Sequence, residues 1–253
     1  MNSLVATDLR VQLGAREVLR GATLAVQRGR FALLAGRNGA GKSTLLRALI
    51  GACRPVAGGV ELEGRPIAAW PHRERARRVA FVPQSVDTPF EFTGGEIVRM
   101  GRYPHHGRDE DLAAADATAI ANAIAAVDAA AFVHRPMPTL SGGEQRRIAV
   151  ARALATEAPF LLLDEPTANL DLEHALQLVA LLRRHTDAGG AVLVASHDLN
   201  LFAPHCDDVA LLHDGRMHTV APPLEALSPE HVRTVFGVTA DAPTGPFPRA
   251  FRL

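Results

Sequence analysis

Short apolar runs separated by polar turns are the main pattern along this chain. Runs of four or five residues rich in Val, Leu, Ala and Phe predict buried strands. They occupy residues 31–35, 79–82, 160–163, 191–195 and 209–212. Apolar residues at helical spacing follow two of these runs, from Glu173 to His185 and from Asp198 onward. Strands that alternate with helices predict a mostly parallel sheet in an α/β fold.

The N-terminal third of the chain has a different pattern. Residues 4–13 and 18–26 carry alternating, β-rich stretches that predict antiparallel strands leading into the strand at 31–35. Residues 60–62 predict another short strand. Residues 71–78 predict a short basic helix, with a proline near its start.

The composition shifts between Ser85 and Glu157, which predicts a helical insert between strands of the main sheet. Within it, residues 112–131 are dense in alanine. A low-complexity segment is the alternative there, but Ile120, Ile124 and Val127 recur at helical spacing and favour a packed helix. The last residues, 240–253, contain several prolines and predict an irregular tail.

The composition is that of an ordinary globular protein. The 253 residues fit one large domain or two small lobes, and 47% are hydrophobic and 21% charged. Because 27 basic residues balance 27 acidic ones, no global field attracts nucleic acid or acidic lipid, although local basic clusters remain possible. The only cysteines, Cys53 and Cys206, indicate a reducing compartment. Without a signal peptide or a run of about 18 apolar residues, we expect a soluble, cytoplasmic chain that reaches a membrane only through a partner.

Residues 36–44 match G-x-x-x-x-G-K-[ST], the phosphate-binding P-loop. They are Gly36, Arg37, Asn38, Gly39, Ala40, Gly41, Lys42, Ser43 and Thr44. A predicted strand precedes them and a predicted helix at 45–50 follows, which is the context that the motif requires. The glycines let backbone N–H groups approach phosphate oxygens, and the helix start adds positive potential. We expect Lys42 to contact the β- and γ-phosphates of a nucleoside triphosphate and Ser43 to offer its hydroxyl to Mg²⁺.

The apolar run at 160–163 ends in two carboxylates, Asp164 and Glu165. Two solvated acids are the usual interpretation of such a pair, but the upstream P-loop favours a catalytic role. Asp164 is suited to hold a Mg²⁺-bound water. Because side chains alternate along an extended chain, Glu165 should point elsewhere, where it could polarise the attacking water.

Other polar stretches are less specific. Ser141 and Glu144 fit a helix capping box, while Gly142 and Gly143 leave a bare helix start suited to phosphate. Taken alone, Gln84 and His197 would be ordinary loop residues. His105 and His106 have no cysteine or acidic partner at ligand spacing, so we expect a solvated loop and not a metal site.

Taken together, these stretches resemble the nucleotide-binding subunits of ABC transporters over roughly residues 4–238. In the family's terms, residues 36–44 are the Walker A loop, Gln84 the Q-loop and Leu140–Gln145 the signature, with Glu144 where the motif name has Gln. Leu161–Glu165 resembles Walker B, Ala168–Asp171 the D-loop, and His197 the switch histidine. The resemblance implies one domain at 1–239: a RecA-like P-loop NTPase core, an antiparallel β-subdomain, and a helical subdomain at about 86–158.

A narrower resemblance is to the iron-chelate and cobalamin import group, most of all to haemin importer ATPases. Met100–His105, Ser196–Leu201 and Val235–Val238 carry it. Two departures stand out. The aromatic residue that often stacks on adenine is missing, since Leu13 or Arg16 stands where it would be expected, and Arg37 replaces a frequent proline.

The family resemblance also implies a mechanism. Two copies pair head to tail, so that each ATP lies between one chain's Lys42 and the other chain's Ser141, Gly142, Gly143 and Glu144. Gln84 contacts the nucleotide and, with Ser43 and Asp164, the Mg²⁺. Glu165 orients or deprotonates water and His197 contacts the γ-phosphate.

The partners implied are a second copy, two membrane-spanning permease subunits and a periplasmic substrate-binding protein, at the cytoplasmic face of a bacterial inner membrane. Neither nucleic acid nor the cargo would touch the chain. The single compact cassette and the neutral charge disfavour a soluble ABC ATPase that acts on ribosomes or DNA. The intact Asp164, Glu165 and His197 disfavour a non-hydrolysing nucleotide-dependent module.

Overall fold

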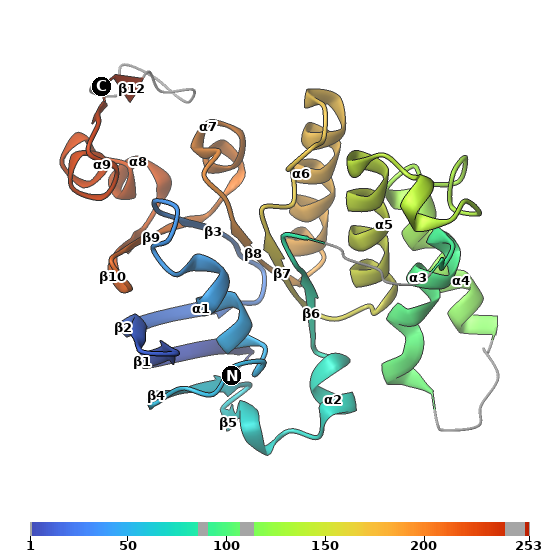
Figure 1. Cartoon of the computed structure of the whole chain (residues 1–253), viewed down its shortest axis with the longest axis horizontal. Coiled ribbons are helices and arrows are strands. Elements are labelled where there is room, and N and C mark those ends of the chain that lie inside the picture. Colours follow the sequence, from blue (N-terminus) through green and yellow to red (C-terminus); the bar gives the residue numbers. More distant parts are fainter. Residues whose placement is uncertain (1, 86–90, 107–113, 241–250, 253) are drawn as a thin grey trace.

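A six-stranded sheet forms the centre of the molecule (Figure 1). The computed structural model describes residues 2–85, 91–106, 114–240 and 251–252. The strands lie in the order β10-β9-β3-β8-β7-β6, and only β10 pairs antiparallel to its neighbour. The prediction of a mostly parallel sheet is therefore confirmed. Their bounds are β3 Phe31–Ala35, β6 Val79–Val82, β7 Phe160–Asp164, β8 Ala191–Ala195, β9 Asp208–His213 and β10 Arg216–Ala221.

A second, antiparallel sheet packs beside the first, in the order β2-β1-β4-β5. It comprises β1 (Ser3–Leu13), β2 (Arg16–Gln27), β4 (Ala57–Leu62) and β5 (Arg65–Pro66), and it confirms the antiparallel strands predicted before the P-loop. Helix α1 (Lys42–Leu49) lies between the two sheets (Figure 1). Its buried Leu45, Leu46 and Leu49 share one core with both sheets.

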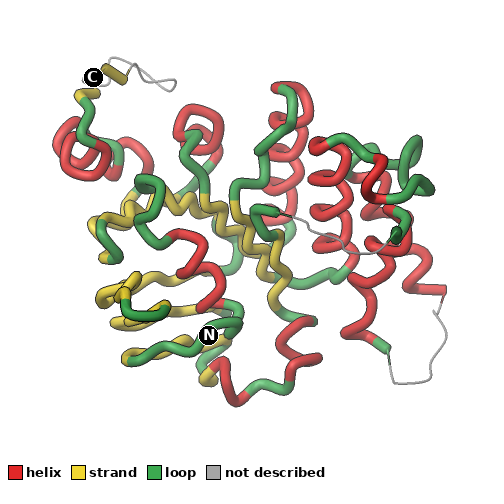
Figure 2. The backbone as a smooth tube through the Cα atoms, viewed as in Figure 1, coloured by secondary structure: helices red, strands yellow, loops and turns green. Residues whose placement is uncertain are grey.

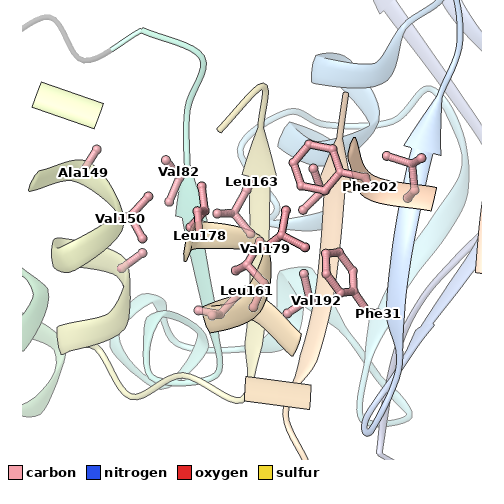
Figure 3. Close-up of a cluster of buried hydrophobic side chains, with 14 of the residues drawn as sticks. Phe31, Val82, Ala149, Val150, Leu161, Leu163, Leu178, Val179, Val192 and Phe202 are labelled. Carbon is pink, nitrogen blue, oxygen red and sulfur yellow. The ribbon is translucent and has the colours of Figure 1, made fainter. Parts of the chain in front are cut away.

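The other face of the central sheet is covered by helices. Side chains alternate along each strand, so Leu34 and Leu162 face α1 while Leu33 and Leu163 face the opposite core. That core also receives Leu178 and Val179 of α6 (Leu172–Asp187) and Phe202 of α7 (Leu199–Phe202), as Figure 3 shows. Strands buried on both faces read as continuous apolar runs, which explains why these runs were visible in the sequence.

Helices gather at the β6 side of the central sheet, between β6 and β7 in the sequence (Figure 2). They are α3 (Gly94–Arg99), η2 (Met100–His105), α4 (Ala114–Ala126), η3 (Met137–Thr139) and α5 (Gly142–Ala155). Ala119 and Ala123 of α4 are buried, and Ile120 and Ile124 pack against the core, so a packed helix is confirmed over a low-complexity segment. The helix is shorter than predicted because the chain turns after Ala126; residues 112–113 lie outside the described part.

Short elements complete the chain. Pro71 precedes α2 (His72–Ala76), which confirms the short basic helix, although it ends two residues before the predicted 78. The others are η1 (Ile67–Ala69), η4 (Ala203–His205), α8 (Pro223–Ala226), α9 (Pro229–Phe236), β11 (Thr239–Ala240) and β12 (Phe251–Arg252). The prediction of an irregular tail is wrong at its ends, because backbone pairing joins β11 to β12, and residues 241–250 and 253 lie outside the described part. None of the helices described has the length and apolar character needed to cross a bilayer.

Candidate active site

The P-loop joins β3 to α1 and depends on close backbone packing. A Cβ on Gly36 would lie 2.3 Å from the Leu212 carbonyl oxygen, and Gly41 adopts φ +108° with a Cβ position 2.9 Å from Leu19. Only glycine fits both constraints. No side chain caps the start of α1 and no acid lies in its first turn. Its N-terminal N–H groups therefore make a site suited to an anion.

Lys42 places a buried cation at this loop. The residue is 7% exposed, and its Nζ donates to the Gly36 carbonyl at 2.8 Å and to the Arg37 carbonyl at 3.4 Å. Burial lowers the pKa of Lys42, while the nearby Glu165 and Asp164 oppose that shift. The ammonium is thus held by loop carbonyls at the place where a phosphate group could replace them.

Asp164 and Ser43 come from different elements and meet at the cleft floor. Asp164 ends β7 and is 2% exposed. Burial raises the pKa of Asp164, and a hydrogen bond from the Ser43 side chain partly offsets the shift. The pair presents a hydroxyl and a carboxylate, the hard oxygen ligands that Mg²⁺ prefers.

These groups line one open cleft of about 430 Å³. Its lining comprises Arg16, Val18, Asn38, Gly39, Gly41, Lys42, Ser43, Thr44, Gln84, Asp164 and Glu165. The structure therefore brings the predicted P-loop, Q-loop and Walker B side chains together. Of the two residues expected near a base, Arg16 lines the cleft, whereas Leu13 is not part of its lining.

Glu165 faces a different set of partners from Asp164. Its Oε1 lies 3.0 Å from His197 Nδ1, and its Oε2 accepts a hydrogen bond from Ser196 Oγ at 3.2 Å. The two adjacent acids thus have different hydrogen-bond partners, as predicted, although both line the cleft. Glu165 also adopts φ +46°, a left-handed conformation that costs a non-glycine residue about 1 kcal/mol or more. The surrounding contacts thus hold the carboxylate in a strained but defined position beside the exposed His197.

Arg146 is a buried residue beside the site that sequence reasoning missed. It lies on α5 and is 5% exposed, and its guanidinium donates to the Pro83 carbonyl at 2.6 Å and to the Gln84 carbonyl. Burial lowers the pKa of Arg146, while the carboxylates of Asp164 and Glu165 oppose the shift. The contact ties the helix after the signature to the backbone of the Q-loop. Its only signal in the sequence was an arginine in the turn that follows the signature glycines.

The signature stretch does not line the cleft of its own chain. Ser141 Oγ accepts from the Glu144 N–H at 3.2 Å, and Glu144 Oε2 accepts from the Ser141 N–H at 2.7 Å, so the capping box forms. Both glycines contact the D-loop stretch: a Cβ on Gly143 would lie 2.9 Å from the Asn169 carbonyl oxygen, and one on Gly142 3.3 Å from the Asn169 side chain. The glycines therefore fix the D-loop against the signature helix.

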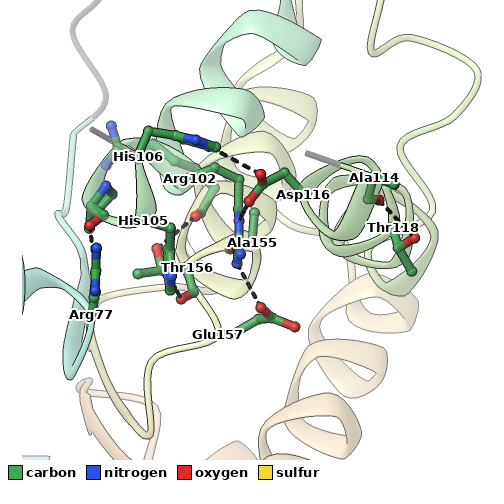
Figure 4. A network of polar contacts seen from close by, with 12 residues as sticks. Arg77, Arg102, His105, His106, Ala114, Asp116, Thr118, Ala155, Thr156 and Glu157 are labelled. Carbon is green, nitrogen blue, oxygen red and sulfur yellow. Dashed lines mark hydrogen bonds and ion pairs between the residues drawn. The ribbon is translucent and has the colours of Figure 1, made fainter. Parts of the chain in front are cut away.

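The stretch Met100–His105 belongs to a buried polar network (Figure 4). Arg102 donates to Asp116 Oδ1 at 2.7 Å, to the Ala155 carbonyl at 2.8 Å and to Glu157 Oε2 at 2.7 Å. His106 Nε2 lies 3.3 Å from Asp116 Oδ2.

The expectation of a solvated loop at His105 and His106 is therefore wrong. Both are half-buried, and His105 Nε2 lies 2.9 Å from the Thr156 carbonyl oxygen. The reason is tertiary, because Asp116 and Thr156 reach these histidines from α4 and from the end of α5. Among the described residues, no cluster of three or more His, Cys, Asp or Glu could hold a metal ion.

Comparison with known proteins agrees with this geometry. A family model described as ABC transporter matches residues 19–168. Hemin import ATP-binding protein HmuV of Streptomyces coelicolor is 46% identical over 96% of this chain and 85% of that protein. Cobalamin import ATP-binding protein BtuD of Halobacterium salinarum is 40% identical over 96% of this chain and 61% of that protein.

Solved structures show the same fold. An ATP-binding subunit of an ABC transporter superposes with a TM-score of 0.78 at 26% identity, over 92% of this chain and 93% of that one. A dimeric bacterial ABC transporter cassette gives a TM-score of 0.78 at 23% identity, over 87% and 98% of the two chains. The match of the family model and the identity to both relatives extend over most of the chain. The chain therefore belongs to the ABC transporter family.

Proposed function

We propose that this chain is the ATP-hydrolysing subunit that energises import of haemin through a membrane transporter. The contact of Glu165 with His197 at 3.0 Å, at the edge of the P-loop cleft, supports hydrolysis. The cargo rests on the 46% identity to a relative named for haemin import. Cobalamin is the second candidate because a 40% identical relative is named for it, and a ferric siderophore is the third.

The phosphates of ATP would lie along the P-loop backbone, from Gly36 to Thr44. Lys42 would leave the Gly36 and Arg37 carbonyls and turn its ammonium toward the β- and γ-phosphates. Ser43 and Asp164, which already share a hydrogen bond, would hold Mg²⁺ together with Gln84 on the same cleft. When bound, Mg²⁺ neutralises charge that develops on the transferred phosphoryl group.

Glu165 would act as the general base on the attacking water. The Ser196 hydroxyl and the His197 ring fix the orientation of its carboxylate, and the strained backbone limits other positions. His197 is 73% exposed, so its ring is free to contact the γ-phosphate while Nδ1 stays near Glu165. This arrangement resembles the base-and-orienter pairs that activate nucleophiles in other enzymes.

A second copy would complete the site. Ser141, Gly142, Gly143 and Glu144 lie away from the cleft of their own chain, and the exposed start of α5 presents N–H groups suited to the partner's γ-phosphate. ATP then contacts both copies only when they are closed, which couples binding to closure.

The remaining features extend the same proposal. Permease subunits would carry the motion across the membrane from the cytoplasmic face of a bacterial inner membrane, and a periplasmic protein would deliver the cargo. Neither nucleic acid nor the cargo would bind this chain. We infer one ATPase domain over 1–239, with a helical subdomain at 86–158 and a tail at 240–253.

The test is Glu165→Gln. The amide cannot act as a base, so steady-state hydrolysis should fall about 10²- to 10⁴-fold while ATP binding is kept. Glu61→Gln, on an exposed position of β4, is the matched control and should turn over like the parent. Hydrolysis near the parent rate in Glu165→Gln would remove this residue from the mechanism.

The cargo is tested in liposomes that contain the assembled transporter. Haem-loaded binding protein should stimulate hydrolysis more than cobalamin- or siderophore-loaded protein. Equal or greater stimulation by another loaded carrier would overturn the haemin assignment and leave the ATPase assignment intact.

A further inference from the structure

A second hollow, of about 500 Å³, shares Asn38 with the nucleotide cleft and is otherwise lined by different residues. Its rim is formed by the first P-loop residues and His197. Its floor is apolar and comes from α7, α9 and the residues after α9: Leu199, Val232, Phe236 and Val238. Neither the phosphate chemistry nor the Glu165 base uses these apolar side chains.

The same chain carries an apolar protrusion of matching chemistry at the start of α6. Leu172 is 70% exposed and Leu176 is 46% exposed, one helical turn apart. Large apolar side chains in such a pair form a continuous exposed stripe. Asp171 and Glu173 flank Leu172, so the protrusion carries negative charge at its tip.

We propose that Leu172 and Leu176 of one copy enter the hollow of a second copy when ATP closes the pair. The proposal rests on the head-to-tail pairing of the proposed function. In that pairing the signature of one chain reaches the P-loop of the other. Asn169 packs directly on Gly142 and Gly143, which places the stretch leading into α6 beside the signature. The hollow begins at the P-loop residues Gly36, Arg37 and Asn38, so it continues the same interface.

Charge favours this occupant. The Arg37 side chain is exposed on the rim of the hollow, and a Cβ on Gly237 would lie 4.0 Å from its Nη1. Within the described part of the chain, no ion pair involves Arg37. The exposed Glu173 on the partner's protrusion offers an acid of opposite charge. Asp198 also lies near the rim, but its carboxylate accepts from the Leu201 N–H at 3.0 Å and caps α7.

Crosslinking between two differently tagged chains tests the contact, both in the Glu165→Gln background. One chain carries Leu172→Cys and the other Val238→Cys, and a short bis-maleimide is added with or without ATP. A heterodimer band should form with ATP and not without it. Val56→Cys in place of Leu172→Cys is the matched control, because Val56 is 62% exposed on the loop before β4. This control also reports any reaction of the native Cys53.

A second measurement follows dimerisation by light scattering, again with the Glu165→Gln chain as the parent. Leu172→Asp should weaken the ATP-driven dimer about tenfold or more, whereas Val56→Asp should stay within about twofold of the parent. Both side chains are exposed, and equal melting temperatures will confirm that folding is unchanged. A dimer of parent affinity in Leu172→Asp, with no crosslink, would overturn the docking and assign the α6 protrusion to another partner, while the ATP-driven pairing would stand. A parent chain that stays monomeric with ATP would overturn both.

Discussion

Arg102 offers the sharpest test of what the stretch Met100–His105 does for the protein. Its guanidinium is 5% exposed and bonds Asp116, the Ala155 carbonyl and Glu157. Arg102→Met keeps the apolar stem but removes every one of these bonds. Asp116 is itself 4% exposed, so its carboxylate would stay buried after losing the guanidinium, with the His106 ring 3.3 Å away.

Breaking a buried ion pair from one side costs about 3–5 kcal/mol, because the remaining charge is not compensated. For a chain of this size, about 1 kcal/mol corresponds to a change in melting temperature of about 2–4 °C. We therefore expect Arg102→Met to lower the melting temperature by about 6–20 °C. Differential scanning calorimetry and urea unfolding measure the loss.

Two controls test whether the loss comes from leaving a buried charge without its partner. Glu17→Gln removes the partner of Arg10 in a surface pair 4.0 Å apart and should cost less than about 1 kcal/mol. The double variant Arg102→Met, Asp116→Leu removes both buried charges and should recover much of the loss. If Arg102→Met costs no more than Glu17→Gln, the network does not hold α4 to the end of α5 and the reasoning is refuted.

Three further outcomes are expected. Gly101→Ala should lower the free energy of unfolding in urea by about 1–3 kcal/mol, because the new Cβ would lie 2.3 Å from the Arg152 carbonyl oxygen. Gly95→Ala is its control: the nearest contact of its Cβ is at 3.5 Å, so it should be neutral or slightly stabilising. Burial lowers the pKa of His185 below 6.5 in the folded state, so the unfolded chain takes up this proton first as the pH falls. The free energy of unfolding should therefore drop between pH 7.5 and 5.5, and His185→Gln should flatten that drop; an unchanged slope would contradict it. GTP should support hydrolysis within about tenfold of ATP, because the described lining of the cleft holds no aromatic side chain to stack on the base and Arg16 is the candidate for selecting it. Competition between the two nucleotides measures this, and a preference for ATP well beyond tenfold would contradict it.

The local chemistry of the site was predictable from the sequence because short stretches determine it. The P-loop needs glycine wherever the backbone passes close to another backbone, as at Gly36 against Leu212, and that need shows in the motif itself. Buried parallel strands read as apolar runs, so β3, β7 and β8 were found within a residue of their ends. Different partners for Asp164 and Glu165 were expected from strand alternation, but Glu165 follows the end of β7 with a left-handed φ of +46°, so the turn sets its direction. Helices α3, α8 and α9 and strand β10 carried weaker patterns, since each is short or exposed on one side, and they were not predicted.

Only the tertiary structure decided which distant residues meet. Arg146 contacts the Q-loop backbone 62 positions away in the sequence, and His106 lies beside Asp116 of α4. Neither contact leaves a local signal in the sequence. The packing of Asn169 against Gly142, which joins the D-loop to the signature, also leaves no local signal. Nor does the hollow between the P-loop and α9. Periodicity and motif spacing report on neighbours along the chain. Contacts between elements depend on how those elements pack, and packing is set by the whole core at once.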